Sequence, residues 1–224
     1  MLKFDRTILK GVSSMNKKLL TVISGFLMLS SFVSQAAVIT YSYADLDASF
    51  NPSTSLLDYY NGLTVTSNSV SDFDMEGTFD DSIMNVTFTF DLAADSEFGI
   101  FAGLDAAYGA EIYINNMLAF DTSEDLWWSK SWGSSDVVSF QQLLSSGENT
   151  ISIIWAEECC GGSSSIAFSS PLINSGDLTV LSVASLSLVE ASAPGAPVSV
   201  NAPGTIGVLA LGLLALVRVR NNRA

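Results

Sequence analysis

The sequence predicts an all-β protein: a jelly-roll-like antiparallel β-sandwich placed between an N-terminal signal peptide and a single apolar C-terminal helix. Three observations support this prediction. Apolar and polar residues alternate through the central part, clusters of Gly, Pro, Asn and Asp separate these runs, and continuous apolar segments occur near both ends. We assign residues 1–36 to the signal peptide, 37–192 to the sandwich, 193–204 to a Pro/Gly linker, and 205–224 to a sorting or anchor helix with a basic tail.

The N-terminal segment has the three parts of a secretory signal peptide. Two adjacent lysines precede an apolar run of residues 19–32, and Ser34 and Ala36 supply the small residues needed before a cleavage site. We therefore predict cleavage after Ala36. The signal is complete from Met15, so residues 1–14 are expected to lie upstream of the true start. A retained anchor helix is the alternative, and the small residues at the end of the segment disfavour it.

The C-terminal segment combines a linker, an apolar run and a basic end. Residues 193–204 are rich in Pro, Gly and Ala, and residues 205–217 are continuously apolar. This run is shorter than the roughly 17–25 residues of a full membrane span. Three arginines follow it directly and favour a cytoplasmic end: Arg218, Arg220 and Arg223.

This arrangement resembles the PEP-CTERM class of sorting signals in Gram-negative bacteria. The short motif of the class is represented here by Asn201, Ala202, Pro203 and Gly204, in the place of the usual Pro-Glu-Pro. The resemblance implies export through the inner membrane and transient anchoring by residues 205–217. It also implies recognition by a membrane sorting protease of the exosortase kind, and display at the cell surface or in the extracellular matrix.

Charge excludes several classes of partner. The chain has 23 Asp and Glu against 9 Lys and Arg, a formal net charge of −14, and Lys130 is the only basic side chain between residues 19 and 217. Nucleic acid is excluded as a partner, because neutralising phosphates requires clustered Lys and Arg. Acidic polysaccharides and anionic membrane surfaces are repelled unless a cation bridges the two surfaces.

The absence of histidine restricts catalysis. Ser–His–Asp and Cys–His mechanisms are excluded, and so are zinc sites with imidazole ligands. Carboxylate-based glycoside hydrolysis remains, and it needs two carboxyl groups about 5–9.5 Å apart. No residue pattern marks such a pair, so we predict that the protein is not an enzyme.

The central part predicts about nine short strands. Residues 84–91 give the clearest alternation, with Met84, Val86, Phe88 and Phe90 on one face. A short helical turn is predicted at residues 139–147. Six of the further strands are predicted at residues 38–45, 62–67, 111–115, 149–157, 164–170 and 178–190.

Aromatic residues divide into a predicted core and a predicted binding surface. Adjacent aromatics in a polar segment cannot both face one core, so the tryptophans at Trp127, Trp128 and Trp132 are predicted to bind a ligand. A loop folded back on the core is the alternative. The expected core consists of Phe73, Phe79, Phe88, Phe90, Phe98, Phe101, Phe120 and Phe168.

The region 99–169 resembles the CCXG group of PEP-CTERM proteins. The shared marks are the Gly-Leu-Asp-Ala segment from Gly103, the pair Trp127-Trp128, the Gly-x-x-Thr segment from Gly147, and Cys-Cys-Gly-Gly from Cys159. The group implies no activity.

The same region is similar, more weakly, to the protective-antigen and flocculin type of carbohydrate-binding sandwich. In that type, paired aspartates hold a calcium ion that orients the sugar; this chain has Asp105-Ala106 at that point. Calcium is therefore a candidate cofactor, with carboxylate ligands from Asp105, Asp121, Glu124 and Asp125.

The only two cysteines, Cys159 and Cys160, are neighbours, and three states are open to them in an oxidising compartment. They could form a vicinal disulfide ring, an intermolecular disulfide, or a reduced buried pair. We favour the ring, because Gly161 and Gly162 can accommodate a distorted turn. A redox enzyme is disfavoured, because Glu157 and Glu158 supply the wrong charge for activating a thiolate.

These observations predict an exported, non-catalytic β-sandwich that binds an extracellular polysaccharide through a rim of Trp127, Trp128, Trp132, Cys159 and Cys160. A structural matrix component without a ligand is the principal alternative. A carboxylate-based glycoside hydrolase is the less favoured one.

Overall fold

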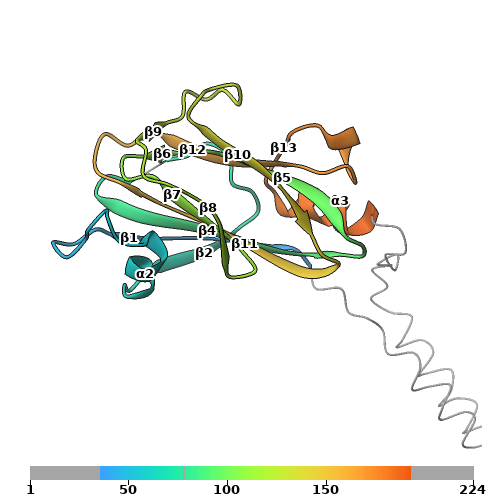
Figure 1. Cartoon of the computed structure of the whole chain (residues 1–224), viewed down its shortest axis with the longest axis horizontal. Helices are drawn as coiled ribbons and strands as arrows, with labels where there is room; N and C mark the ends of the chain where they lie inside the picture. Colours follow the sequence, from blue (N-terminus) through green and yellow to red (C-terminus); the bar gives the residue numbers. More distant parts are fainter. Residues whose placement is uncertain (1–35, 78, 193–224) are drawn as a thin grey trace, which may run out of the picture. The chain divides into compact units, whose positions relative to one another are not determined.

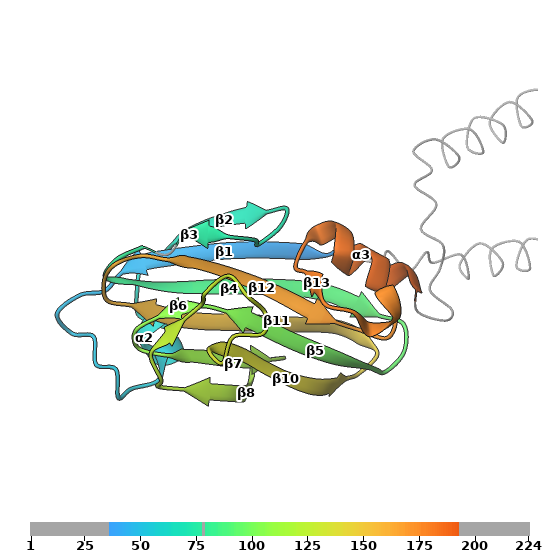
Figure 2. The same ribbon diagram turned by 90° about the horizontal axis from the view of Figure 1, so that it is seen from above.

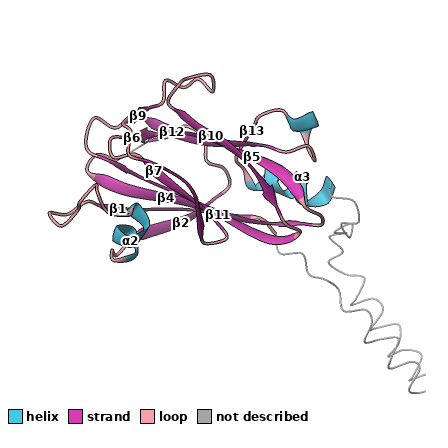
Figure 3. Cartoon of the chain, viewed as in Figure 1, coloured by secondary structure: helices cyan, strands magenta, loops and turns pink. Residues whose placement is uncertain are grey.

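The computed structural model describes residues 36–77 and 79–192, which form a two-layer antiparallel β-sandwich (Figures 1 and 3). The fold class predicted from the sequence is thereby confirmed. Apart from Ala36, the predicted signal peptide lies outside the described residues, as do the linker and the C-terminal helix. Within the part of the chain that the structure describes, no helix is long and apolar enough to cross a membrane.

The larger layer is a six-stranded sheet in the order β2-β1-β4-β11-β7-β8. Its centre is the ladder between β4 and β11, which runs from Ser82 opposite Glu157 to Leu92 opposite Gly147. The strands are β1 (Val38–Asp45), β2 (Thr66–Val70), β4 (Ser82–Leu92), β7 (Ala110–Ile114), β8 (Met117–Thr122) and β11 (Gly147–Glu157).

The smaller layer has the order β10-β5-β12-β13, and β3 pairs with the start of β12. In a separate two-stranded ribbon, β6, which follows β5 directly along the chain, pairs with β9, which follows β8. The strands are β3 (Glu76–Gly77), β5 (Ser96–Gly103), β6 (Asp105–Ala106), β9 (Leu126–Trp127), β10 (Val137–Leu144), β12 (Ser163–Ser169) and β13 (Thr179–Val180).

Aromatic rings from both layers meet in the core. The alternation in β4 turns Phe88 and Phe90 to the same face, where Phe90 lies 5.1 Å, centroid to centroid, from Phe98 of β5. Phe98 in turn stacks 4.9 Å from Phe168 of β12. This row of rings joins the two sheets, and rings of this kind dominate the energetics of such cores.

The outer face of the six-stranded sheet is covered at one end by the short helix α2 (Leu56–Asn61). Leu56 packs on a second apolar cluster with Ile83 of β4 and Ile154 of β11. The α2 N-terminus is held by Glu111 of β7, whose carboxylate accepts the backbone N–H groups of Leu56 and Leu57 at 2.9 and 3.0 Å.

Three predicted elements differ from the structure. The strand predicted at residues 62–67 begins only at Thr66, as β2. Residues 178–190 contain the short strand β13 and then helix α3 (Val183–Ser192) in place of one strand. A reciprocal capping pair starts this helix: the Ser182 hydroxyl accepts the Ser185 N–H, and the Ser185 hydroxyl accepts the Ser182 N–H, both at 3.0 Å. The predicted helical turn at 139–147 is mostly strand β10, because full pairing with β5 outweighs the helix propensity of Gln and Leu.

The predicted phenylalanine core is largely correct. Phe101 and Phe120 are half-buried, and Phe79 is wrong, being 45% exposed beside Tyr43. Five of the set are buried: Phe73, Phe88, Phe90, Phe98 and Phe168. The remaining short helix η1 (Asn174–Gly176) connects β12 to β13.

We expect Phe98→Ala to lower the free energy of unfolding by about 3–5 kcal/mol, because the ring is fully buried between two other rings. Phe79→Ala removes the same atoms from an exposed position and should cost much less. Denaturant unfolding followed by circular dichroism measures both. Equal losses for the two variants would contradict this description of the core.

Candidate functional site

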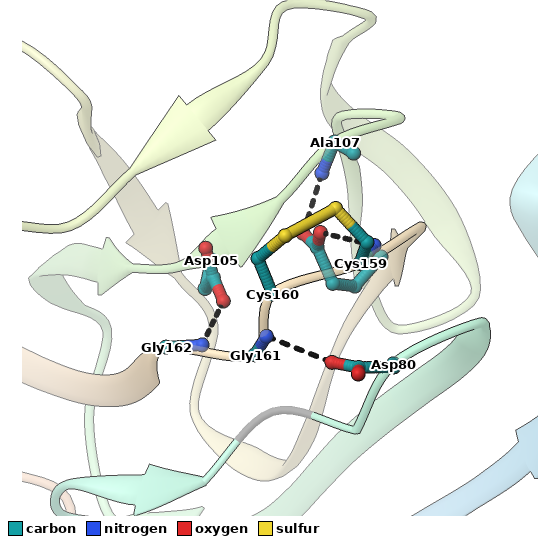
Figure 4. The surroundings of a disulfide bond; sticks show 8 residues. Asp80, Asp105, Ala107, Cys159, Cys160, Gly161 and Gly162 are labelled. Carbon is teal, nitrogen blue, oxygen red and sulfur yellow. Dashed lines mark hydrogen bonds between the residues drawn. A yellow bond between two sulfur atoms is a disulfide. The ribbon is translucent and has the colours of Figure 1, made fainter.

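The two cysteines lie in the turn that joins β11 to β12 (Figure 4). A disulfide bond joins Cys159 to Cys160, whose Cα atoms are 3.8 Å apart, and both residues are exposed. Cys160 has φ +70°, a left-handed conformation that closes the turn. Of the three states open from the sequence, the structure contains the vicinal ring. We call residues 158–162 the disulfide turn.

Carboxylates from three separate parts of the chain accept the backbone N–H groups of the disulfide turn (Figure 4). Glu157, at the end of β11, accepts the N–H of Cys159 at 3.0 Å. Asp80, in the connection between β3 and β4, accepts the N–H of Gly161 at 2.8 Å. Asp105 of β6 accepts the N–H of Gly162. The turn is therefore the point where three distant segments are joined.

A side chain at position 162 would force the Asp105 carboxylate to move. A Cβ atom on Gly162 would lie 2.8 Å from the Asp105 carboxylate. Glycine thus permits the close approach of backbone and carboxylate.

Two of these carboxylates are buried. Asp105 is 3% exposed and Glu157 is 4% exposed. Burial raises the pKa of both, and the neighbouring charges of Asp125 and Asp80 raise the pKa of Asp105 further. Donated N–H groups act in the opposite direction, including that of Ala107, which lies 2.8 Å from Glu157.

The exposed tryptophan of the predicted rim lies next to Asp105. Trp127 of β9 stands directly opposite Asp105 of β6, so the two side chains project from the same face of the ribbon. The Asp105 side chain reaches Gly162, and Trp127 is 56% exposed. The structure therefore places an exposed indole and an exposed disulfide around one buried carboxylate.

The other two predicted rim tryptophans require correction. Trp128 is buried at 4% exposure and packs over Gly103, where a Cβ atom would lie 2.5 Å from the indole ring. Trp132 is half-buried, and its ring centroid lies 5.0 Å from that of Trp128. Both rings close this end of the sandwich, which is the alternative that the sequence left open.

The four carboxylates predicted to share calcium are not brought together. Asp105 is engaged with the disulfide turn, and Glu124 and Asp125 line a pocket of about 430 Å³ between β8 and β10. Asp121 lines a different pocket of about 480 Å³, beside the N-terminus of α2. Across residues 36–77 and 79–192, no group of three or more Asp, Glu or Cys side chains is arranged to hold a metal ion. The predicted calcium ligand set is therefore not formed there.

Sequence reasoning missed Asp80 and Glu157 as parts of the site. Glu157 follows an apolar strand and could be noticed as the last residue before the cysteines. Asp80 is 81 residues away from Gly161, so only the folded chain shows their contact. The predicted sorting motif, Asn201 to Gly204 with Arg218, Arg220 and Arg223, lies outside the described residues.

Searches against known proteins give structural similarities only. No protein-family model and no curated protein sequence matches the chain. The A domain of epithelial adhesin 9 from Candida glabrata, solved with Galb1-3GlcNAc, is 10% identical with a TM-score of 0.45, covering 65% of this chain and 89% of that one. The PA14 domain of the antifreeze protein MpAFP is 11% identical with a TM-score of 0.49, covering 69% and 93%.

A GH31 alpha-xylosidase from Xanthomonas citri is 15% identical with a TM-score of 0.37, covering 64% of this chain and 16% of the enzyme. At these identities and TM-scores, the likeness carries no conclusion about a ligand or a function.

We expect burial of Glu157 to make the folded state less stable at neutral pH than in mild acid. Its raised pKa means that the folded state binds a proton more tightly than the unfolded state does. The free energy of unfolding should therefore rise as the pH falls from about 7 through that raised pKa. Denaturant unfolding at a series of pH values measures this rise.

The general acidity of the domain acts in the same direction, so the test compares two variants. Glu157→Gln should flatten the pH dependence more than Glu148→Gln, which removes the same charge from an exposed position of the same strand. An identical pH dependence in the two variants would contradict the assignment to the buried carboxylate.

Proposed function

We propose that the protein is an exported, non-catalytic β-sandwich that binds carbohydrate at a rim formed by Trp127 and the Cys159–Cys160 disulfide. The main support for this proposal is the exposed indole of Trp127, which lies opposite Asp105. The Asp105 carboxylate in turn holds the disulfide turn. An exposed aromatic face packs on the apolar C–H face of a sugar ring. Nearby carboxylate oxygens accept hydrogen bonds from sugar hydroxyl groups.

The position of the rim supports a role in display. The β6–β9 ribbon lies at one end of the sandwich, and helix α3 lies at the other (Figures 1 and 2). The chain continues from α3 into the linker predicted at residues 193–204. A domain tethered through that linker would direct the rim away from its attachment.

The negative charge around the rim restricts the kind of ligand that can bind. Asp80, Asp105, Asp125 and Glu158 lie in or near the rim, and the only basic side chain of the domain is Lys130. Anionic polysaccharides would be repelled, whereas neutral sugars would not. A neutral extracellular polysaccharide is therefore the proposed partner, without calcium in the described site.

Burial argues against glycoside hydrolysis at this site. A glycosidase needs two carboxyl groups that face the scissile bond of its substrate. Asp105 and Glu157 are the close, buried pair here, and both accept backbone N–H groups. Their arrangement supports a structural role in holding the disulfide turn.

The two ends of the chain supply the rest of the proposal. The signal peptide would direct export, with cleavage after Ala36. The tail at residues 201–223 would be read by a membrane sorting protease of the exosortase kind, as its resemblance to PEP-CTERM signals implies. The domain would then reside at the cell surface or in the extracellular matrix of a Gram-negative bacterium.

We expect the protein to bind one or more neutral polysaccharides on an array, and Trp127→Ala to weaken that binding at least about tenfold, because stacking on the indole is lost. Leu143→Ala is the matched control: Leu143 is 61% exposed and lies at the far end of β10. Addition of a chelator should leave binding unchanged.

Three results would contradict the proposal in different ways. Absence of binding to every polysaccharide would favour the structural matrix component. Binding that Trp127→Ala leaves intact would place the ligand elsewhere. Binding that disappears on addition of a chelator would support a calcium-dependent site and contradict the proposed binding without calcium.

A further inference from the structure

Among the described residues, the core begins at Ala37, directly after the predicted cleavage site. Ala36 is exposed, whereas Ala37 is 4% exposed and belongs to the main core cluster, immediately before β1. The register of β1 with β4, in which Val38 lies opposite Thr89, brings Ala37 beside Asp91, whose N–H is 3.0 Å from the carboxylate of Glu190 in α3. The backbone N–H of Ala37 therefore lies near that carboxylate, and it lowers the pKa of Glu190. Figure 2 shows the start of β1 beside α3.

Glu190 is a half-buried carboxylate, and Lys130 is the only basic side chain in the described part of the chain. It also accepts the N–H of Asp91 at 3.0 Å, which ties α3 to the end of β4. Burial raises the pKa of Glu190, the Asp91 charge raises it further, and the two donated N–H groups lower it. Lys130, the one basic side chain of the domain, follows β9 along the chain, and the label of β9 lies at the end of the sandwich opposite α3 (Figure 1).

Cleavage after Ala36 would create a cation at this carboxylate. Water adds across the Ala36–Ala37 peptide bond, so Ala36 leaves with a new carboxylate and the nitrogen of Ala37 becomes an amine. That amine carries a proton at neutral pH. The nitrogen whose neutral N–H lies near Glu190 would become a charged group with three donors. Charge-assisted hydrogen bonds are about twice as strong as neutral ones.

We propose that Glu190 is the binding site for the α-ammonium group of a mature chain that begins at Ala37, so that signal-peptide removal completes an ion pair between β1 and α3. The inference rests on the proposed export. The site is specific to one cleavage position. Cleavage one residue earlier would place the charge one residue, about 3.8 Å, farther along the chain. Cleavage one residue later would remove Ala37 from the core.

The test uses the chain from Ala37 to Ala224 with a free α-amino group and the same chain with that group acetylated. Acetylation restores the neutral amide N–H and removes only the charge. We expect acetylation to raise the equilibrium constant for unfolding about tenfold, as measured by denaturant titration. In Glu190→Gln the effect of acetylation should disappear, and in the control Glu148→Gln it should persist.

Two outcomes would overturn the ion pair. Acetylation could leave the stability of the wild-type chain unchanged, or it could have the same effect in Glu190→Gln as in the wild type. The wild-type comparison needs no substitution, so the test stands even if Glu190→Gln fails to fold.

N-terminal sequencing of the exported protein tests the underlying processing step. A start at Ala37 supports both the export and the ion pair. A start elsewhere would overturn the proposed cleavage, and with it the ion pair in the cell. A start at Ala37 together with no effect of acetylation would overturn the ion pair alone.

Discussion

Pairing of buried carboxylates with backbone N–H groups is the interaction on which this structure depends. The domain has one basic side chain, Lys130, so its buried acids cannot be neutralised by lysine or arginine. Each accepts N–H groups from a distant segment: Asp105 from Gly162 in the disulfide turn and Glu157 from Ala107. The half-buried Glu111 and Glu190 do the same, with donors at the start of α2 and at Asp91 of β4. Such a donor lowers the cost of burying a charge while fixing the position of both segments. Carboxylates therefore have two effects in this domain: they repel anions from its surface, and through their backbone N–H donors they hold distant segments of the chain together.

The same kind of pairing occurs at both ends of the sandwich. At one end, the vicinal disulfide holds a turn whose N–H groups face three carboxylates, and Trp127 stands beside them. At the other end, Glu190 of α3 accepts the N–H of Asp91 in β4 and lies near the start of β1. We propose that the first end binds a ligand. We propose that the second end forms an ion pair once the signal peptide has been removed.

Local patterns in the sequence predicted the fold class but not the contacts that build the site. The alternation of apolar and polar residues in β4 identifies its buried face, because a repeat of two residues is typical of a strand with one face toward the core. In α3 the same kind of apolar pattern misled, because the Ser182–Ser185 capping pair and the buried side chains of Leu186 and Val189 favour a helix. The exposed Trp127 was expected, whereas Trp128 could not be separated from it before Gly103 was known to lie beneath the ring. Long-range contacts such as Asp80 with Gly161 have no local signature.

Hydrogen exchange at the disulfide turn tests the central claim most directly. The amides of Ala107, Gly161 and Gly162 are measured in the oxidised protein and after reduction by a neutral dithiol, with alkylation of both cysteines confirming reduction. If the closed turn holds the buried carboxylates, these amides exchange slowly when oxidised and at least about tenfold faster after reduction, while the β4–β11 ladder is unchanged. Unchanged rates at these three amides, or faster exchange throughout the ladder, would contradict the account.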